Sequence, residues 1–422
     1  MQFEEDFQGA CRIDLNTTYR STKNILEAAN ALIQPNKARI AREIDTTQDR
    51  GQPVQLLLTP TPATEAKYAA ETARARIDTD GGSVAVLYRT NAQSRAMEAA
   101  FKDEKLPYKI VGGESFYESK EVLDSLSCIS VTLDPHADDE ATKRFVTMVP
   151  GERISKTAIR QIDHGGRRGD SFYDKLKVAA EDGTLSARDA RIAMKRISTI
   201  ETLQAAADDP PAQIIQKGLA GTGYKSALEQ SDDKRRLDKL DNIEELVADA
   251  QQFALDQRSQ ATDAEPYNDQ IAHGFVRQCE EIRAAAHEQE QNGQCVTLST
   301  LHAAKGLEFD TVVFAGFDSE RMPHRRSIAE TDNPEGAVEE ERRLAYVGMT
   351  RARTELHLTV PLTIGHGNRQ RRVARSEFIN DIPDQLIEQR LPNKPHPRPS
   401  AAADTERGHE REPAQEYAAA SR

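Results

Sequence analysis

Long apolar runs are missing from this sequence, and their absence is the first constraint on what the protein can be. Of its 422 residues, 37% are hydrophobic and 30% are charged, and no run approaches the roughly eighteen consecutive apolar residues that a membrane-spanning helix needs. The basic start of a signal peptide is also missing, because residues 3–7 read Phe-Glu-Glu-Asp-Phe. The sequence therefore predicts a cytoplasmic protein with no membrane partner.

Cysteine is scarce, and its spacing excludes two further classes of protein. The four cysteines form no C-x-x-C pair and lie far apart, as Cys11, Cys128, Cys279 and Cys295. Neither a zinc site nor a disulfide framework is indicated, so we expect buried free thiols and no metal ligands. The formal net charge of −13 by itself argues against a nucleic-acid partner, unless a local groove does the binding.

The phosphate-binding loop of many nucleotide hydrolases, G-x-x-x-x-G-K-[ST], is absent as well. The nearest glycine cluster, at residues 218–225, reads Gly-Leu-Ala-Gly-Thr-Gly-Tyr-Lys. Tyr224 stands before the lysine, so the spacing of the loop fails. No phosphate cradle of this type is predicted in the chain.

Two long segments in the last third of the chain are its most specific features. Residues 297–310 read Thr-Leu-Ser-Thr-Leu-His-Ala-Ala-Lys-Gly-Leu-Glu-Phe-Asp, and residues 340–352 read Glu-Glu-Arg-Arg-Leu-Ala-Tyr-Val-Gly-Met-Thr-Arg-Ala. They resemble motifs V and VI of the UvrD, Rep and PcrA helicases of superfamily 1, enzymes that unwind DNA by hydrolysing ATP. A chance match over so many fixed positions, in the right order and spacing, is negligible.

Other segments extend the resemblance. Residues 15–22, Leu-Asn-Thr-Thr-Tyr-Arg-Ser-Thr, resemble motif IV, and residues 84–95 and 108–117 resemble the segment that follows it. The similarity covers residues 12–135 and 293–383 well and the middle poorly. In this family the phosphate loop and an acidic metal-binding pair precede motif IV, and here only eighteen residues precede Tyr19. The resemblance therefore implies the C-terminal half of a helicase, beginning at Met1.

Alternating strands and helices are predicted in two stretches of the chain. Strands are expected at residues 54–58, 84–88, 108–111, 295–299, 311–315 and 356–360, with helices at 64–77 and 92–105. This alternation predicts an α/β fold with a parallel sheet covered on both faces. The resemblance identifies it as a RecA-like domain of the P-loop-NTPase type.

The stretch between these two parts shows amphipathic helices and almost no strand signal. In the clearest, apolar residues recur at helical spacing from Leu237 to Ala254, which is typical of a core-facing helix. The predicted domains are residues 1–136 and 291–385 for the sheet, 137–290 for an all-helical insert, and 386–422 for a tail. The tail is expected to be disordered because Pro, Ala, Glu and Arg dominate it without apolar periodicity.

The resemblance assigns four residues to a nucleotide site. Carried over by position, Arg20 and Arg351 are arginine fingers, Tyr19 stacks on adenine, and Glu308 holds the ribose hydroxyls. Arginine suits its role because the planar, permanently charged guanidinium reaches phosphate oxygens in bidentate fashion. The expected cofactor is ATP in a shared site, with Mg²⁺ held by the missing half.

A second set of residues is implied for DNA. By resemblance, Arg89, Asn91, Thr300 and His302 contact a single strand that crosses between the two motor domains, and such contacts tolerate any base sequence. The family's Pro-x-x-Gly-Ile-Gly hairpin, which grips duplex DNA, reads Pro-Gly-Glu-Arg-Ile-Ser at residues 150–155. The family's Ser-Arg-Phe-Leu signature reads Ser-Glu-Phe-Ile at residues 376–379. The implied partners are single-stranded DNA, duplex junctions and the half that carries the Walker motifs.

The leading interpretation is the C-terminal portion of an ATP-dependent 3′ to 5′ DNA helicase of the DNA-repair type, inactive alone because the Walker motifs are absent. One alternative is a non-catalytic DNA-binding or regulatory remnant, and the presence of both Arg20 and Arg351 argues against it. A helicase–nuclease fusion would need a downstream nuclease domain, where this chain has only the predicted tail.

Overall fold

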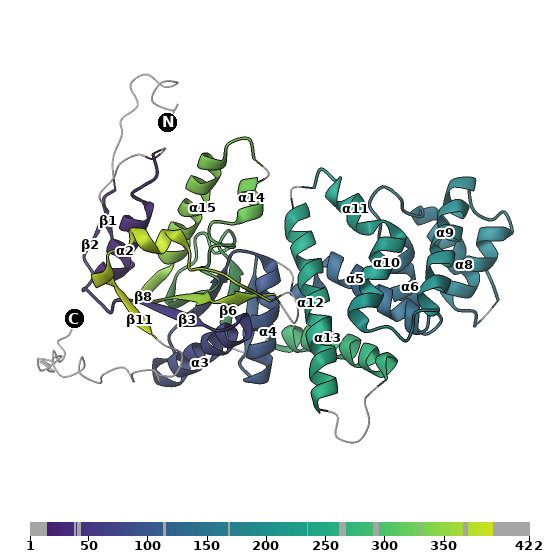
Figure 1. Ribbon diagram of the computed structural model, residues 1–422, viewed down its shortest axis with the longest axis horizontal. Helices are drawn as coiled ribbons and strands as arrows, with labels where there is room; N and C mark the ends of the chain where they lie inside the picture. The colour runs from purple at the N-terminus through teal and green to yellow at the C-terminus, as the bar shows by residue number, and fades with distance from the viewer. Residues whose placement is uncertain are drawn as a thin grey trace, which may run out of the picture. The chain divides into compact units, whose positions relative to one another are not determined.

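The computed structural model describes residues 15–37, 39, 44–112, 115–167, 169–233, 235–260, 267–289, 295–329, 331–365 and 370–390. Within these residues a seven-stranded sheet lies beside a group of helices (Figure 1). Its strands are β3 (Val54–Thr59), β4 (Val84–Tyr88), β5 (Tyr108–Val111), β6 (Val296–Thr300), β7 (Phe309–Phe314), β8 (Ala352–Pro361) and β11 (Ile387–Arg390).

The strand order is β11-β3-β8-β7-β4-β6-β5, and every pairing is parallel. The predicted α/β fold with a RecA-like parallel sheet is therefore confirmed. Strands β4 and β5 match the predicted bounds at both ends, and β4 is a continuous buried apolar run. Strand β8 begins four residues earlier than predicted, since its residues 353 and 354 are exposed and give no apolar signal.

Helices cover both faces of the sheet, and the side chains of each strand alternate between them. Val84, Val86 and Tyr88 pack under α3 (Pro62–Asp80) and α4 (Ser94–Asp103). Ala85 and Leu87 face the opposite core, which contains α2 (Lys23–Ile33) and α15 (Pro334–Met349). The alanines of α3 let it pack closely on the sheet, since Ala66, Ala69, Ala70 and Ala73 are fully buried.

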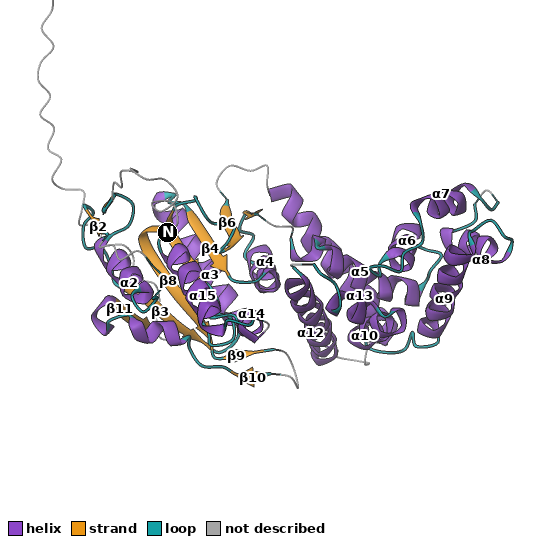
Figure 2. Cartoon of the chain, turned by 90° about the horizontal axis from the view of Figure 1, so that it is seen from above, coloured by secondary structure: helices purple, strands orange, loops and turns teal. Residues whose placement is uncertain are grey.

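The segment between β5 and β6 is helical and has its own core (Figure 2). Its helices are α5 (Lys120–Leu133), α6 (Asp139–Thr147), α7 (Lys156–His164), α8 (Phe172–Glu181), α9 (Ala187–Gln204), α10 (Pro211–Thr222), α11 (Tyr224–Glu229), α12 (Arg236–Gln260) and α13 (Asn268–Gln289). The core takes in Phe116, Val122 and Ile129, so it begins before the boundary that the sequence suggested at residue 137. The glycine cluster at residues 218–225 forms the end of α10 and the start of α11.

Shorter elements complete the described chain. They are β1 (Thr17–Thr18), β2 (Asp45–Thr46), β9 (Thr363–Ile364), β10 (Arg371–Arg372), α14 (Arg325–Ala329) and the 3₁₀ turns η1 (Asn91–Gln93), η2 (Phe116–Glu118), η4 (Glu377–Asp381) and η5 (Asp384–Leu386). The helix predicted over residues 92–105 is thus divided, with η1 before α4 and a left-handed Lys105 after it. Cys128 and Cys279 are buried free thiols, as expected, while Cys295 is partly exposed.

The predicted start of the tail at residue 386 is wrong. Strand β11 (Ile387–Arg390) pairs in parallel with β3. Backbone hydrogen bonds hold this strand in place, because none of its four side chains is fully buried. Residues 391–422 lie outside the described residues. Of the helices that the structure describes, none is long and apolar enough to cross a bilayer.

Candidate nucleotide and nucleic-acid sites

Backbone hydrogen bonds bring three distant segments together at the amino ends of β7 and β8. The amide of Thr22 donates to the carbonyl of Arg353 at 2.9 Å, and the amide of Phe309 donates to the carbonyl of Arg351 at 3.0 Å. The turn of motif IV, the start of β7 and the end of motif VI therefore share one edge of the sheet. All four residues predicted to bind a nucleotide lie in or beside these segments.

Arg20 and Glu308 form an ion pair at this edge. Arg20 also donates from Nη1 to the carbonyl oxygen of Thr350 at 3.3 Å, and Glu308 accepts from Nη2 of Arg353 at 3.1 Å. The hydrogen bond from Arg20 is the main reason that the pKa of Glu308 lies below its ordinary value. Glu308 is therefore an ionised acceptor between two guanidinium groups.

Arg351 is oriented by main-chain carbonyls. Its Nε donates to Val347 in the last turn of α15 at 2.9 Å, and its Nη1 donates to Leu307 at 3.1 Å. Burial lowers the pKa of Arg351, and the positive charge of Arg20 acts in the same direction. Two guanidinium groups that repel each other beside one carboxylate form a site in which an added polyanion is favoured.

Tyr19 and Arg20 add two features that suit a nucleotide. The Tyr19 side chain is 71% exposed, and its carbonyl is held by Nε2 of Gln48 at 2.7 Å. The Nε atom of Arg20 is buried and has no hydrogen-bond partner among the described residues. This end of the strands therefore carries an exposed aromatic ring, a carboxylate and two guanidinium groups, the four side chains that the resemblance assigned to a nucleotide.

The four residues predicted to contact DNA line one cavity of about 820 Å³. Arg89 and Asn91 follow β4, whereas Thr300 ends β6 and His302 follows it. Strands β4 and β6 are adjacent and parallel, so their carboxyl ends meet at the edge where open α/β sheets bind ligands. The structure therefore brings these four residues together.

Arg89 is held by a carboxylate from motif VI. Its Nε and Nη2 donate to the two oxygens of Glu341 at 2.9 and 2.7 Å, and both side chains are largely buried. Partial burial in the cavity lowers the pKa of His302, and the charge of Arg89 adds to this effect. His302 is thus neutral near pH 7 and offers a hydrogen bond rather than a charge.

The two groups of residues lie at opposite ends of the parallel strands, one at the amino ends and the other at the carboxyl ends. Glu308 and Arg351 precede β7 and β8, whereas Arg89 and His302 follow β4 and β6. A strand of five or six residues spans about 17–20 Å, which sets the separation between the two sites. Helix α15 connects them, because it carries Glu341 within its length and ends at Met349, two residues before Arg351.

Two glycines permit the loops at these sites. Gly112 has a φ of +77°, and a Cβ there would lie 2.0 Å from the Cβ of Ala303, so only glycine lets the loop after β5 approach the motif V loop this closely. Gly306 has a φ of +92°, a backbone conformation that favours glycine, in the turn that follows His302. In the altered hairpin, Ser155 instead caps α7, since its hydroxyl accepts from the amide of Ala158 at 3.1 Å.

The model of the UvrD-like helicase C-terminal domain matches residues 13–362.

The chain belongs to the UvrD-like helicase C-terminal domain family.

Among curated relatives of this family member, the ATP-dependent DNA helicase UvrD1 of Mycobacterium leprae is 33% identical over 405 residues, covering 92% of this chain and 51% of that protein. UvrD1 of Mycobacterium tuberculosis strain H37Rv is 32% identical over 411 residues, covering 95% and 52%. DNA helicase II of Escherichia coli strain K12 is 31% identical over 392 residues, covering 92% and 52%. The chain therefore spans about half the length of the curated relatives it matches.

Proposed function

We propose that this chain contributes the second motor domain and helical insert of an ATP-dependent 3′ to 5′ DNA helicase. The observation that carries the proposal is the joint placement of Arg20, Glu308 and Arg351 at one sheet edge, where a facing domain could present a nucleotide. The names of the relatives, ATP-dependent DNA helicases, support it. A Walker-motif half completes the site and holds Mg²⁺.

In this proposal each residue has a distinct task. Arg20 and Arg351 stabilise the charge that develops on the transferred phosphoryl group, an effect worth roughly 10³ to 10⁵ in turnover in related hydrolases. Tyr19 stacks on the base and Glu308 accepts from the ribose hydroxyls. At the other edge, Arg89, Asn91, Thr300 and His302 line the path of a single strand, and the helical insert faces a duplex junction.

Reconstitution of the ATPase tests this proposal. We expect the purified chain alone to hydrolyse no ATP above background, and addition of a matching Walker-containing half to restore DNA-stimulated hydrolysis. Arg20→Ala and Arg351→Ala should each lower the restored turnover by about a thousandfold or more, because each removes a cation from the transition state. The measurement is steady-state phosphate release with and without single-stranded DNA.

Arg50→Ala provides the matched control. Arg50 is an exposed arginine that pairs with Glu27 at 3.4 Å, near motif IV but outside the proposed site, and its loss should leave turnover unchanged. Equal turnover in wild type and both finger variants would exclude the assignment of Arg20 and Arg351. If no mixture hydrolyses ATP but the chain still binds single strands, a non-catalytic DNA-binding remnant becomes the better description.

A further inference from the structure

The cavity that contains Arg89 and His302 has a second wall, built by the helical insert. Two of its charged residues, Lys120 and Glu121, lie in the first turn of α5. Three more lie at the start of α12 or directly before it, and these are Arg235, Asp238 and Lys239. None of these residues belongs to motifs IV, V or VI. The cavity is therefore enclosed by parts of the chain that are more than 100 residues apart in sequence.

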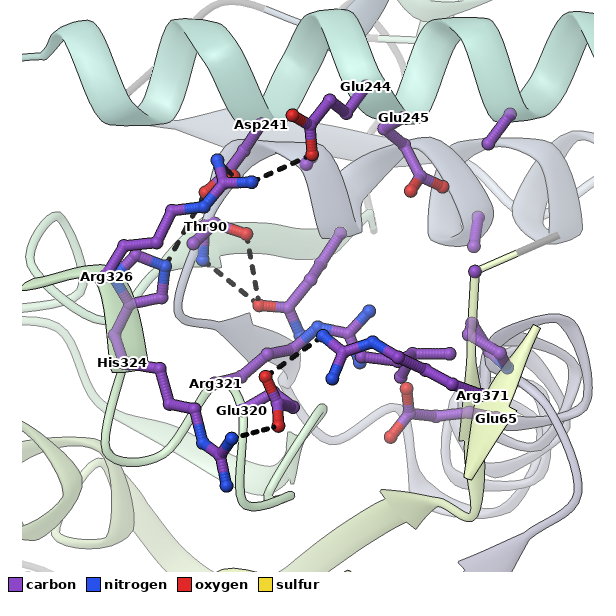
Figure 3. A pocket seen from close by; sticks show the side chains of 18 of the residues that line it. Glu65, Thr90, Asp241, Glu244, Glu245, Glu320, Arg321, His324, Arg326 and Arg371 are labelled. Carbon is purple, nitrogen blue, oxygen red and sulfur yellow. Dashed lines mark hydrogen bonds and ion pairs between the residues drawn. The ribbon is translucent and has the colours of Figure 1, made fainter. Parts of the chain in front are cut away.

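Ion pairs hold α12 against the sheet part of the chain (Figure 3). Arg326 pairs with Asp241 and, at 2.8 Å, with Glu244. On α4, Arg95 pairs with Asp249 at 2.7 Å, where both side chains are about nine-tenths buried. These contacts place the second wall opposite the ends of β4 and β6.

The lining of the cavity is basic in an acidic chain. Four cationic side chains line it, Arg89, Lys120, Arg235 and Lys239, against the two carboxylates of Glu121 and Asp238. Three of these cations are paired with carboxylates that are not part of the lining: Arg89 with Glu341, Lys120 with Asp124, and Lys239 with Asp233 at 2.5 Å. The formal charge of the lining is thus +2, whereas that of the chain is −13, and such a concave basic surface attracts anions.

The rings in the lining are few. Among the lining residues that the structure describes, the only rings are the imidazoles of His302 and His324. Sequence-tolerant binding by stacking needs aromatic side chains, so this cavity suits the charged backbone of a nucleic acid better than its bases.

We propose that Arg235 and Lys239 of α12, with Lys120 of α5, form a second line of phosphate contacts for the single strand. This inference rests on the proposed function, since it extends the same DNA site. The strand passes between the sheet edge and the helical insert, and both walls neutralise its phosphates. Each neutralised phosphate releases counterions, contributing about 0.7 to the slope of log K against log salt for single strands.

The test is fluorescence anisotropy of the full chain with a labelled oligodeoxythymidine over a series of salt concentrations. The variant that carries both Arg235→Ala and Lys239→Ala should bind more weakly, by about fivefold to tenfold for each cation removed at low salt, with the slope reduced by about 1.4. Lys217→Ala is the matched control, because this exposed lysine of α10 is paired with Asp209 outside the cavity, and it should change nothing.

A charge of the opposite sign gives an independent arm of the test. Asp238 lines the cavity, whereas Asp256 lies on the same helix and is exposed outside it. Asp238→Ala should strengthen binding and Asp256→Ala should not, because only the first removes a carboxylate near the phosphates.

The outcomes separate this inference from the proposed function. If the wild-type chain binds no single strand, or if it binds one and Arg89→Ala leaves the affinity unchanged, the proposed DNA site fails as a whole. If Arg89→Ala weakens binding but the α12 double variant keeps the affinity and slope of wild type, the second wall is overturned while the sheet-edge site stands. Equal effects of Asp238→Ala and Asp256→Ala would also overturn it.

Discussion

Arg20 meets a carboxylate at the place where it is proposed to meet phosphate. Its partner Glu308 is shared with Arg353, so a nucleotide that binds Arg20 competes with an internal anion. Under the proposed function Glu308 turns to the ribose while Arg20 turns to the phosphates. The ion pair thus positions both residues before the ligand arrives, at the expense of some binding free energy.

Glu65 is a buried acid whose ionisation affects stability. Its Oε1 accepts from the amide of Gly316 at 2.9 Å and from Oγ1 of Thr359 at 2.6 Å, beside the pocket of Figure 3. Burial raises its pKa to about 7 from 4.5. Because the folded pKa is the higher one, the contribution of protonated Glu65 is complete below about pH 4.5 and is lost as the pH rises through about 7.

We therefore expect Glu65→Gln to remove part of the pH dependence of folding. The amide oxygen of glutamine can accept the same two hydrogen bonds without an ionisation. Urea unfolding at about pH 5 and about pH 8 should show similar stabilities at the lower pH and a more stable variant at the higher pH, by on the order of 3 kcal/mol at most. A pH dependence of unfolding that is the same in both proteins would contradict this account.

At the scale of elements, α15 is packed so closely on the sheet that its last turn needs a glycine. A Cβ on Gly348 would lie 2.5 Å from Cδ2 of Leu301 and 2.9 Å from Cε1 of Phe314. Alanine normally favours a helix over glycine by up to about 1 kcal/mol, but overpacking a core costs about 1–3 kcal/mol. We therefore expect the cost of the steric overlap to exceed the gain in helix propensity at this position.

Gly348→Ala should accordingly lower the free energy of unfolding by roughly 1–2 kcal/mol. Gly274→Ala in α13 is the comparison, since its Cβ would approach no closer than 3.3 Å to Cζ of Phe253, and it should be neutral or slightly stabilising. Chemical denaturation of both variants measures the difference. A Gly348→Ala protein as stable as the Gly274→Ala protein would show that α15 can shift to make room.

The elements differ in how far their sequence predicts them. Strand β4 is a continuous apolar run and was predicted at both ends. Strand β11 was missed because its four residues are partly or fully exposed and are held by backbone pairing with β3, which leaves no side-chain pattern. Local sequence predicts an element only where side-chain burial, rather than pairing, decides its structure.

The candidate sites divide in the same way. The motif residues were predicted because each motif is contiguous, and Arg89 and His302 line one cavity in the structure. The contact between Arg89 and Glu341 joins residues 252 positions apart, and the wall formed by Arg235 and Lys239 depends on how α12 meets the sheet. No local sequence pattern encodes either arrangement, so both became visible only in the three-dimensional structure.

At the scale of the whole molecule, the two proposed sites lie at opposite ends of the strands. The residues proposed for the nucleotide precede β7 and β8, and those proposed for DNA follow β4 and β6; under the proposed function a facing domain touches both. Under the proposed function, this chain, which spans about half the length of its relatives, contributes residues to each site. Under the proposed function, a molecule of net charge −13 binds DNA through a cavity whose lining residues carry a formal charge of +2.

Strand β11 is an edge strand of the sheet and consists of only four residues. Residues Ile387 to Arg390 occupy the hydrogen-bonding groups along the outer side of β3. Shortening the chain to end at Leu386 would leave those groups unpaired, and an uncovered strand edge is a template for another copy of the same strand. We expect such a truncated protein to self-associate in size-exclusion chromatography with light scattering, whereas a chain ending at Arg390 should have the oligomeric state of the full-length protein. If both truncated proteins have the same oligomeric state, β11 is not needed to prevent self-association. If they differ, four residues of which only Ile387 is apolar keep this protein from self-associating through β3.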